Sequence, residues 1–98
     1  MRIKVTTIVW LYPGMAGNWH FASLDKESVE KVKKFQKGKP RLGWGSVPVQ
    51  VILGKTKWRT SIFPDSKSGT YILPLKAQVR KKEHIHEGDA VTFSCVLQ

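Results

Sequence analysis

Apolar and polar residues alternate along two adjacent stretches of the chain, residues 47–53 and 56–63. Alternation with a period of two is typical of a β-strand that buries one face. Gly54-Lys55, which separates the stretches, suits a two-residue hairpin turn with glycine at its first central position. We therefore predict a β-hairpin. Pro48 has no amide proton to donate to a neighbouring strand, so strand 47–53 is predicted to start at an edge of its sheet.

Other segments have the alternation, or the β-branched and aromatic composition, of further strands. Turn-forming residues such as glycine, proline, asparagine and aspartate separate most of them. With the hairpin, they bring the prediction to about six short strands, the additional ones spanning residues 2–12, 19–24, 70–73 and 90–97.

Helical spacing replaces the alternation in two places. Asp25 is a good N-cap, and a narrow apolar stripe follows at intervals of three residues: Val29, Val32 and Phe35. This pattern predicts a helix over about residues 26–36, ended by Gly38. A second, strongly basic helix is predicted over about residues 75–83, with Leu75 and Val79 facing inward.

Taken together, these elements predict a mainly β fold: a small closed or split β-barrel of about six strands with two short capping helices. The length of 98 residues suits a single domain, residues 1–98.

Charge is the strongest compositional signal. The chain has 17 Lys and Arg residues against 7 Asp and Glu residues, for a formal net charge of +10. Such an excess favours association with a polyanion or another anionic partner. The basic residues concentrate in three segments, residues 31–41, 55–59 and 76–82.

From these segments, and with Trp44 added, we select nine candidate residues for anion or nucleic-acid binding. Lys76 and Arg80 are four residues apart and should share one helix face, where together with Arg59 they could hold an anion. A tryptophan, Trp44 or Trp58, could stack on a base. The alternative is a solvated basic surface with tryptophans in the core, and we assign Trp58 to the core because it is in phase with Ile62. The nine candidates are Lys33, Lys34, Lys37, Arg41, Trp44, Lys57, Arg59, Lys76 and Arg80.

The segment Glu83-His84-Ile85-His86-Glu87-Gly88-Asp89 resembles a metal or acid–base site. Two histidines and a carboxylate could bind zinc or nickel, although a structural site needs four ligands. The competing interpretation, which we favour, is a helix end followed by a turn in which Asp89 bonds backbone amides. No nucleophile–base set is visible, so we predict no catalytic residue, no metal and no cofactor.

Cys95 is the only cysteine, which excludes an intrachain disulfide. It has the same parity as the apolar residues of strand 90–97, and we predict a small core residue. The N-terminal segment has the pattern of a strand and not of a signal peptide, and no apolar run is long enough to span a membrane. We therefore expect a cytoplasmic protein.

An ordered series of motifs resembles the DUF1905 family, a domain of unknown function. The resemblance covers about residues 2–97 and implies a double-split β-barrel, an architecture shared with swapped-hairpin bacterial regulators and antitoxins. Position 84 is often glycine in that family and is His84 here. The motifs are Val47-Pro48-Val49-Gln50-Val51, Gly54, Trp58-Arg59-Thr60-Ser61-Ile62-Phe63-Pro64, Gly69, Tyr71, Leu73-Pro74-Leu75-Lys76, Val79-Arg80-Lys81 and Gly88-Asp89.

The leading functional hypothesis is a non-enzymatic binding domain for an anionic partner, with nucleic acid first and a small phosphate or carboxylate ligand second. The alternative is a protein-interaction module or homodimer that uses an edge strand such as residues 47–53. A metal-dependent enzyme is third.

Overall fold

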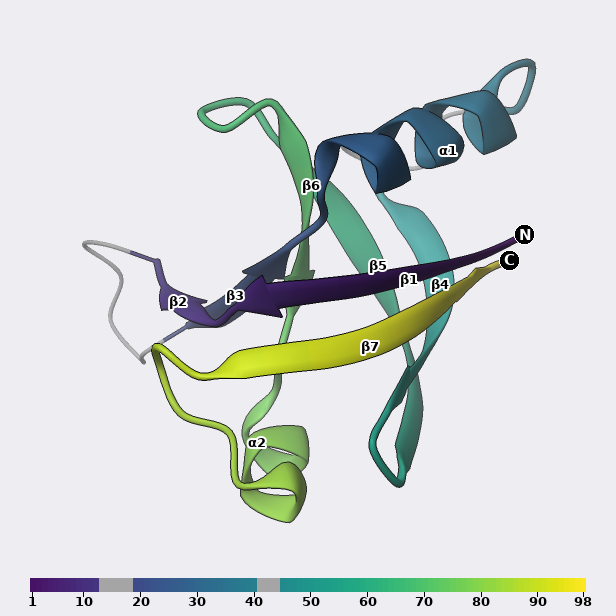
Figure 1. Cartoon of the computed structure of the whole chain (residues 1–98). Coiled ribbons are helices and arrows are strands. Elements are labelled where there is room, and N and C mark those ends of the chain that lie inside the picture. The colour runs from purple at the N-terminus through teal and green to yellow at the C-terminus, as the bar shows by residue number, and fades with distance from the viewer. Residues whose placement is uncertain (13–18, 41–44) are drawn as a thin grey trace.

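The computed structural model describes residues 1–12, 19–40 and 45–98. The predicted mainly β fold with two short helices is confirmed (Figure 1). In chain order the elements are β1 (Arg2–Ile8), β2 (Trp10–Leu11), β3 (His20–Ser23), α1 (Lys26–Gln36), β4 (Val47–Leu53), β5 (Thr56–Asp65), β6 (Thr70–Pro74), α2 (Ala77–Glu83) and β7 (Ala90–Leu97).

Seven antiparallel strands form a nearly closed barrel in the order β1-β7-β4-β5-β6-β3-β2. Strand β5 belongs to both halves of the barrel. Its first part, Thr56–Ile62, pairs with β4, and its last part, Phe63–Asp65, pairs with β6. The two strands that end this series, β1 and β2, are consecutive in the chain, and strand pairing does not seal the seam between them.

The predicted single strand 2–12 is in fact two strands, because the chain changes partner at Val9. Its amide N donates to the Asp89 carbonyl at 2.9 Å, and its own carbonyl accepts from the Gly88 amide N at 2.8 Å. The residues before Val9 pair with β7, and those after it pair with β3. Alternation in the sequence shows that a segment is extended, but it does not show such a change of partner.

The predicted edge position of strand 47–53 is wrong. Strand β4 lies between β5 and β7, so both of its edges are paired. Pro48 is tolerated because the ladder with β7 begins only at Val49, one residue later. At Pro48 the carbonyl accepts a bond from the Gln98 amide N at 3.1 Å, and no amide donor is needed on that side.

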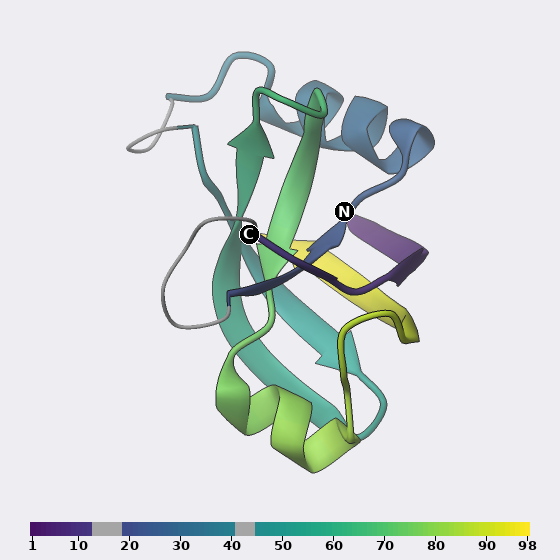
Figure 2. The same ribbon diagram turned by 90° about the vertical axis from the view of Figure 1, so that its left-hand side faces the viewer.

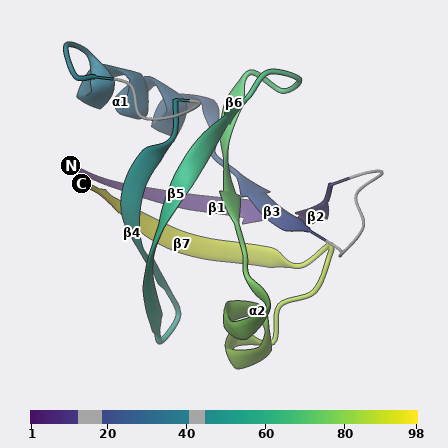
Figure 3. The ribbon, with the colours of Figure 1, turned by 180° about the vertical axis from the view of Figure 1, so that it is seen from behind.

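The core lies between the two halves of the barrel and contains the apolar face of each strand. All four odd-numbered apolar residues of β4 are buried, as the alternation predicted. Cys95 is fully buried in β7, which confirms its assignment to the core. Helix α1 covers one end of the barrel and α2 the other, and the three views agree on this (Figures 1, 2 and 3).

The helices follow the predicted pattern, with one difference in length. Helix α1 has the predicted bounds, and the Asp25 carboxylate accepts from the Ser28 amide N at 2.7 Å as an N-cap. Helix α2 begins at Ala77, two residues later than predicted. Leu75 is buried as predicted, but its amide N donates to the His20 carbonyl at 3.0 Å and so remains outside the helix. No helix among the described residues is long and apolar enough to cross a membrane.

Candidate anion-binding site

The basic residues selected from the sequence separate into two groups. Lys33 and Lys34 are on α1 and Lys37 is its C-cap residue, whereas Lys76 and Arg80 flank or belong to α2 at the opposite end of the barrel (Figures 1 and 3). A single continuous stripe through both helices is therefore not formed by these residues. Two further candidates, Arg41 and Trp44, are outside the described residues.

A pocket of about 350 Å³ lies beside α2 and combines three of the predicted cations. Arg59 comes from β5, Lys76 from the residue before α2, and Arg80 from its second turn. The described lining residues include no acid: Trp19, His20, Trp58, Arg59, Thr60, Pro74, Leu75, Lys76, Ala77 and Arg80. We call this the α2 pocket.

The α2 pocket exists because two neighbouring strands diverge. β5 and β6 pair only at the end near their connecting turn, where Phe63–Asp65 faces Thr70–Ile72. From there β6 leads to α2 while β5 continues along β4, and the two strands move apart (Figure 3). The residues of β5 that line the pocket, Trp58 to Thr60, lie in the part of β5 that pairs with β4 but not with β6.

Arg80 is held in place by the backbone. Its Nε donates to the Leu75 carbonyl at 3.0 Å, which fixes the guanidinium group beside the start of α2. An arginine has five N–H donors, so this bond uses one of them and fixes the plane of the group. Arg59 and Lys76 are exposed at the rim. The arrangement provides one oriented guanidinium and two exposed cations around one cavity.

Two tryptophans line the α2 pocket in different ways. Trp58 is partly buried and packs against the hydrophobic core, as predicted. Trp19 is 49% exposed, and its ring stacks on Phe21 with centroids 6.3 Å apart and an interplanar angle of 16°. We did not select Trp19 from the sequence, which placed it only on the same strand face as Phe21. The one sequence signal was its position beside a turn, where exposure is common.

Lys57, another predicted site residue, lies next to the α2 pocket. It lines a smaller cavity of about 70 Å³ together with Trp58, Lys76 and Lys82. Because Trp58 and Lys76 line both cavities, the basic surface continues along β5 from one to the other.

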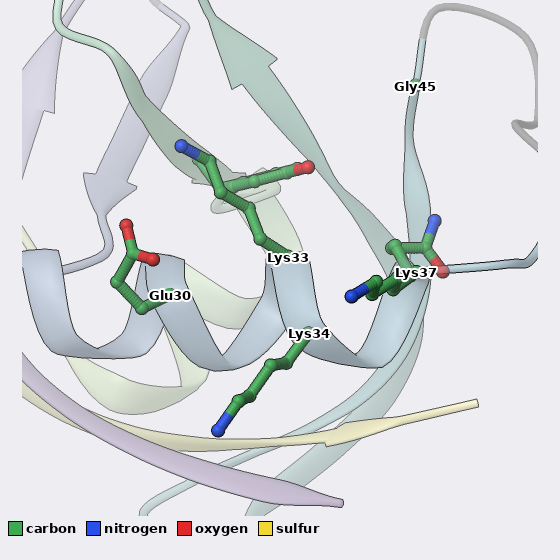
Figure 4. A pocket seen from close by; sticks show the side chains of 7 residues that line it. Glu30, Lys33, Lys34, Lys37 and Gly45 are labelled. Atoms are coloured by element: carbon green, nitrogen blue, oxygen red, sulfur yellow. The ribbon is translucent and has the colours of Figure 1, made fainter.

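The α1 lysines line a separate, shallower cavity of about 430 Å³. Figure 4 shows that Lys33 and Lys34 extend to opposite sides of the helix and that Glu30 lies one turn away. A carboxylate in the lining lowers the positive potential there. Nearer the start of α1, Lys31 Nζ forms an ion pair with Glu27 Oε1 at 3.8 Å. The α1 charges are therefore dispersed and partly compensated.

Glu83 joins α2 to the β4–β5 hairpin. Its Oε2 accepts from the Thr56 hydroxyl at 2.6 Å and from the Lys55 amide N at 3.3 Å. Gly54 has a φ of +58°, and a Cβ at this position would collide with the Glu83 carboxylate. The contact holds α2, which carries Arg80, in position against the first part of β5.

The histidine segment forms the end of α2 and a turn. His84 takes the left-handed conformation, with φ +55° and ψ +48°, which glycine adopts without strain. The Asp89 carboxylate accepts from the His86 amide N at 2.8 Å, which confirms the predicted turn. No group of three His, Cys, Asp or Glu residues that could hold a metal ion occurs in the described part of the chain. Burial raises the pKa of the Cys95 thiol to about 12, which keeps it protonated.

Comparison with known proteins adds one finding to this geometry. A family model described as "Domain of unknown function (DUF1905)" matches residues 6–94, which is nearly the whole chain. No curated protein matches the sequence.

Proposed function

The chain belongs to the DUF1905 family, and because that family has no known function, we propose one from the geometry of the α2 pocket. The protein is a binding domain for a ligand that carries a phosphate or carboxylate group, and it is not an enzyme. The observation that carries the proposal is the convergence of Arg59, Lys76 and Arg80 on one pocket whose described lining has no acid.

Physical reasoning supports an anionic ligand there. Three positive charges around one concave surface repel each other, and an anion between them relieves that repulsion. Charge-assisted hydrogen bonds from guanidinium and ammonium groups are about twice as strong as neutral ones. Arg80 is already oriented by its bond to Leu75, so less conformational entropy is lost when it binds.

Nucleic acid remains our first choice of ligand and a small phosphate or carboxylate compound the second. The net charge of +10 favours a polyanion, and Lys57 extends the basic surface beyond the pocket. A nucleic acid at the α2 pocket need not reach the α1 lysines. The proposal includes the cytoplasmic location expected from the sequence, for which the single buried thiol is suited.

The proposal is tested by titrating the protein with inorganic phosphate by calorimetry and with a labelled mixed-sequence oligonucleotide by fluorescence anisotropy. Affinity for the oligonucleotide should fall steeply between about 50 and 200 mM salt. We expect the Arg59→Ala and Lys76→Ala variants each to bind both probes about tenfold more weakly, since a hydrogen bond to a charged group contributes about 1.5–3 kcal/mol.

The matched control removes two charges from α1. The double variant Lys33→Ala, Lys34→Ala should change the affinity for inorganic phosphate by less than about twofold, because these lysines are remote from the pocket. If neither inorganic phosphate nor the oligonucleotide binds at low salt, the proposal is refuted. An equal loss in the α1 control would reduce it to nonspecific attraction by net charge.

The alternative function, self-association or protein interaction through an edge strand, stays a prediction, but the edge can no longer be that of strand 47–53. Since β4 is paired on both sides, the relevant edge is the outer edge of β1, at the unsealed seam. Sedimentation equilibrium over a hundredfold range of concentration tests it, because a self-associating module gives a mass that rises with concentration.

A further inference from the structure

We infer that the α2 pocket accepts a nucleotide unit, with the base stacked on Trp19 and the phosphate among Arg59, Lys76 and Arg80. This inference rests on the proposed function and names the class of anion. It adds that the ligand has an aromatic base and that the base is unpaired when it binds.

The first observation is the exposure of Trp19 at the edge of a cationic pocket. Its side chain is 49% exposed, although tryptophan is the largest apolar side chain and is highly buried on average. Its ring lies nearly parallel to that of Phe21, with an interplanar angle of 16° and centroids 6.3 Å apart. An exposed aromatic ring beside cations is the element on which bases stack in single-stranded nucleic-acid sites.

The second observation is that Trp19 has a rigid support. Phe21 packs against Trp10 and Tyr12, with ring centroids 5.3 and 5.7 Å away, and those two rings also contact each other at 5.9 Å. The Trp10 indole N–H donates to the Ser23 hydroxyl at 2.9 Å, which fixes that ring on β3. A platform that is ordered before binding loses little entropy when a ligand arrives. Three aromatic residues therefore support one exposed indole ring beside three cations.

The third observation concerns size and composition. The volume of about 350 Å³ lies at the small end of the range for small-molecule sites. The lining combines cations with aromatic residues and with polar groups of His20 and Thr60. A simple phosphate ion uses only the cations. A base with its attached phosphate uses both parts of the lining.

The requirement for an unpaired base follows from the geometry of stacking. In a duplex the faces of a base are covered by the neighbouring base pairs, so an indole ring cannot stack without displacing one of them. A single strand or a free nucleotide presents an open face. The inference therefore predicts a preference for single strands at equal phosphate content.

The experiment compares four probes: inorganic phosphate, a nucleoside monophosphate, a single-stranded hexanucleotide and a duplex of the same sequence. Trp19→Ala should weaken binding of the hexanucleotide about tenfold, which is typical for the loss of one base–aromatic stack. The same variant should leave the affinity for inorganic phosphate within twofold. Trp19→Phe should lose less than Trp19→Ala, because it keeps an aromatic ring.

A second readout reports stacking directly. A hexanucleotide with one 2-aminopurine should show quenched fluorescence on binding to the wild-type protein, and Trp19→Ala should remove the quenching. Thermal unfolding of both Trp19 variants identifies any loss of folding. If Trp19→Ala were to misfold, the result with Trp19→Phe and the wild-type quenching would still decide.

The outcomes separate the two proposals. If Arg59→Ala and Lys76→Ala weaken phosphate binding but Trp19→Ala leaves hexanucleotide affinity and quenching unchanged, the base site is refuted and the anion site stands. Equal binding of single strand and duplex also refutes the base site. If none of the four probes binds at low salt, both proposals fail.

Discussion

The two ends of the barrel carry similar charge in different arrangements. Around α1, lysines are distributed over several sides of an eleven-residue helix, and Glu27 and Glu30 lie among them. Around α2, a helix of seven residues, Arg80 and the preceding Lys76 converge with Arg59 from another strand. Charge density along the sequence is therefore a poor guide to a site. The difference is that β5, the strand beside α2, does not pair with β6 over Thr56–Ile62, which leaves room for a pocket.

The helices also differ in what holds them to the barrel. Helix α1 has a side-chain N-cap of its own, in Asp25. Helix α2 lacks a side-chain cap bond at its start, and its last residue, Glu83, bonds instead to the distant hairpin. α1 thus has a local stabilising bond at its N-terminus that α2 lacks, although tertiary packing contributes most of the stability of helices this short. Four predictions test this contrast, in order of decreasing expected effect.

The largest effect is expected from removing the leucine that precedes each helix. Leu24 and Leu75 are both buried, and the amide N of each donates to a carbonyl on a strand, at 2.9 and 3.0 Å. Leu24→Ala and Leu75→Ala should each lower the free energy of unfolding by about 2–5 kcal/mol, measured by urea denaturation. Only Leu75→Ala should also weaken phosphate binding, because Leu75 lines the α2 pocket and the cavity left by the shorter side chain would let the backbone carbonyl that orients Arg80 shift. Equal loss of binding in both variants would contradict the contrast.

A smaller effect is expected at Glu83. Glu83→Ala removes the acceptor for the Thr56 hydroxyl and the Lys55 amide N. We expect Glu83→Ala to lower the free energy of unfolding by about 1–3 kcal/mol. Glu83→Gln should lower it less, because the amide oxygen can still accept a hydrogen bond. The control is Glu30→Ala on the exposed surface of α1, which should stay within about 0.5 kcal/mol. A similar cost for both substitutions would show that α2 has no special dependence on the hairpin.

The cap of α1 should contribute less. Asp25→Ala should cost about 1 kcal/mol, and Asp25→Asn much less, because asparagine also accepts from the Ser28 amide N. Neither change should alter phosphate affinity, since α1 lies at the other end of the barrel. A calorimetric titration of both variants checks this, and a shift of more than twofold would link the two ends.

The smallest expected effect is a gain in stability. His84→Gly should raise the free energy of unfolding by about 0.5–1 kcal/mol, because glycine adopts the left-handed conformation at little cost. Lys81→Gly, within the regular part of α2, should instead lower it by about 1 kcal/mol. Thermal denaturation with opposite signs for the two variants is the expected result. A loss at position 84 would indicate that the imidazole makes a compensating contact.

Much of the fold follows from local patterns in the sequence. Strands 47–53 and 90–97 and helix 26–36 have the predicted bounds, and the turn at Gly54-Lys55 is confirmed. Each depends on alternation, capping or turn chemistry, which act within a few residues. The errors concern the choice of partner. The change of partner at Val9 and the central position of β4 depend on where β7 begins and ends, some forty or more residues away.

The site was predictable to a similar degree. The pairing of Lys76 with Arg80 follows from helical spacing, and their meeting with Arg59 in one pocket agrees with the sequence prediction. The remoteness of Lys33 and Lys34 and the participation of Trp19 could not be predicted. They depend on which end of the barrel each helix covers, and no short-range pattern encodes that.

The divergence of β5 and β6 has a thermodynamic consequence. Over Thr56–Ile62, β5 has no ladder to β6, so at this place the two halves of the barrel are joined by side chains and α2 rather than by backbone hydrogen bonds. A ligand bound between Arg59 and Arg80 would connect β5 to α2 across the place where β5 and β6 are not paired. Because such a ligand would bind only the folded barrel, the melting temperature would rise with ligand concentration.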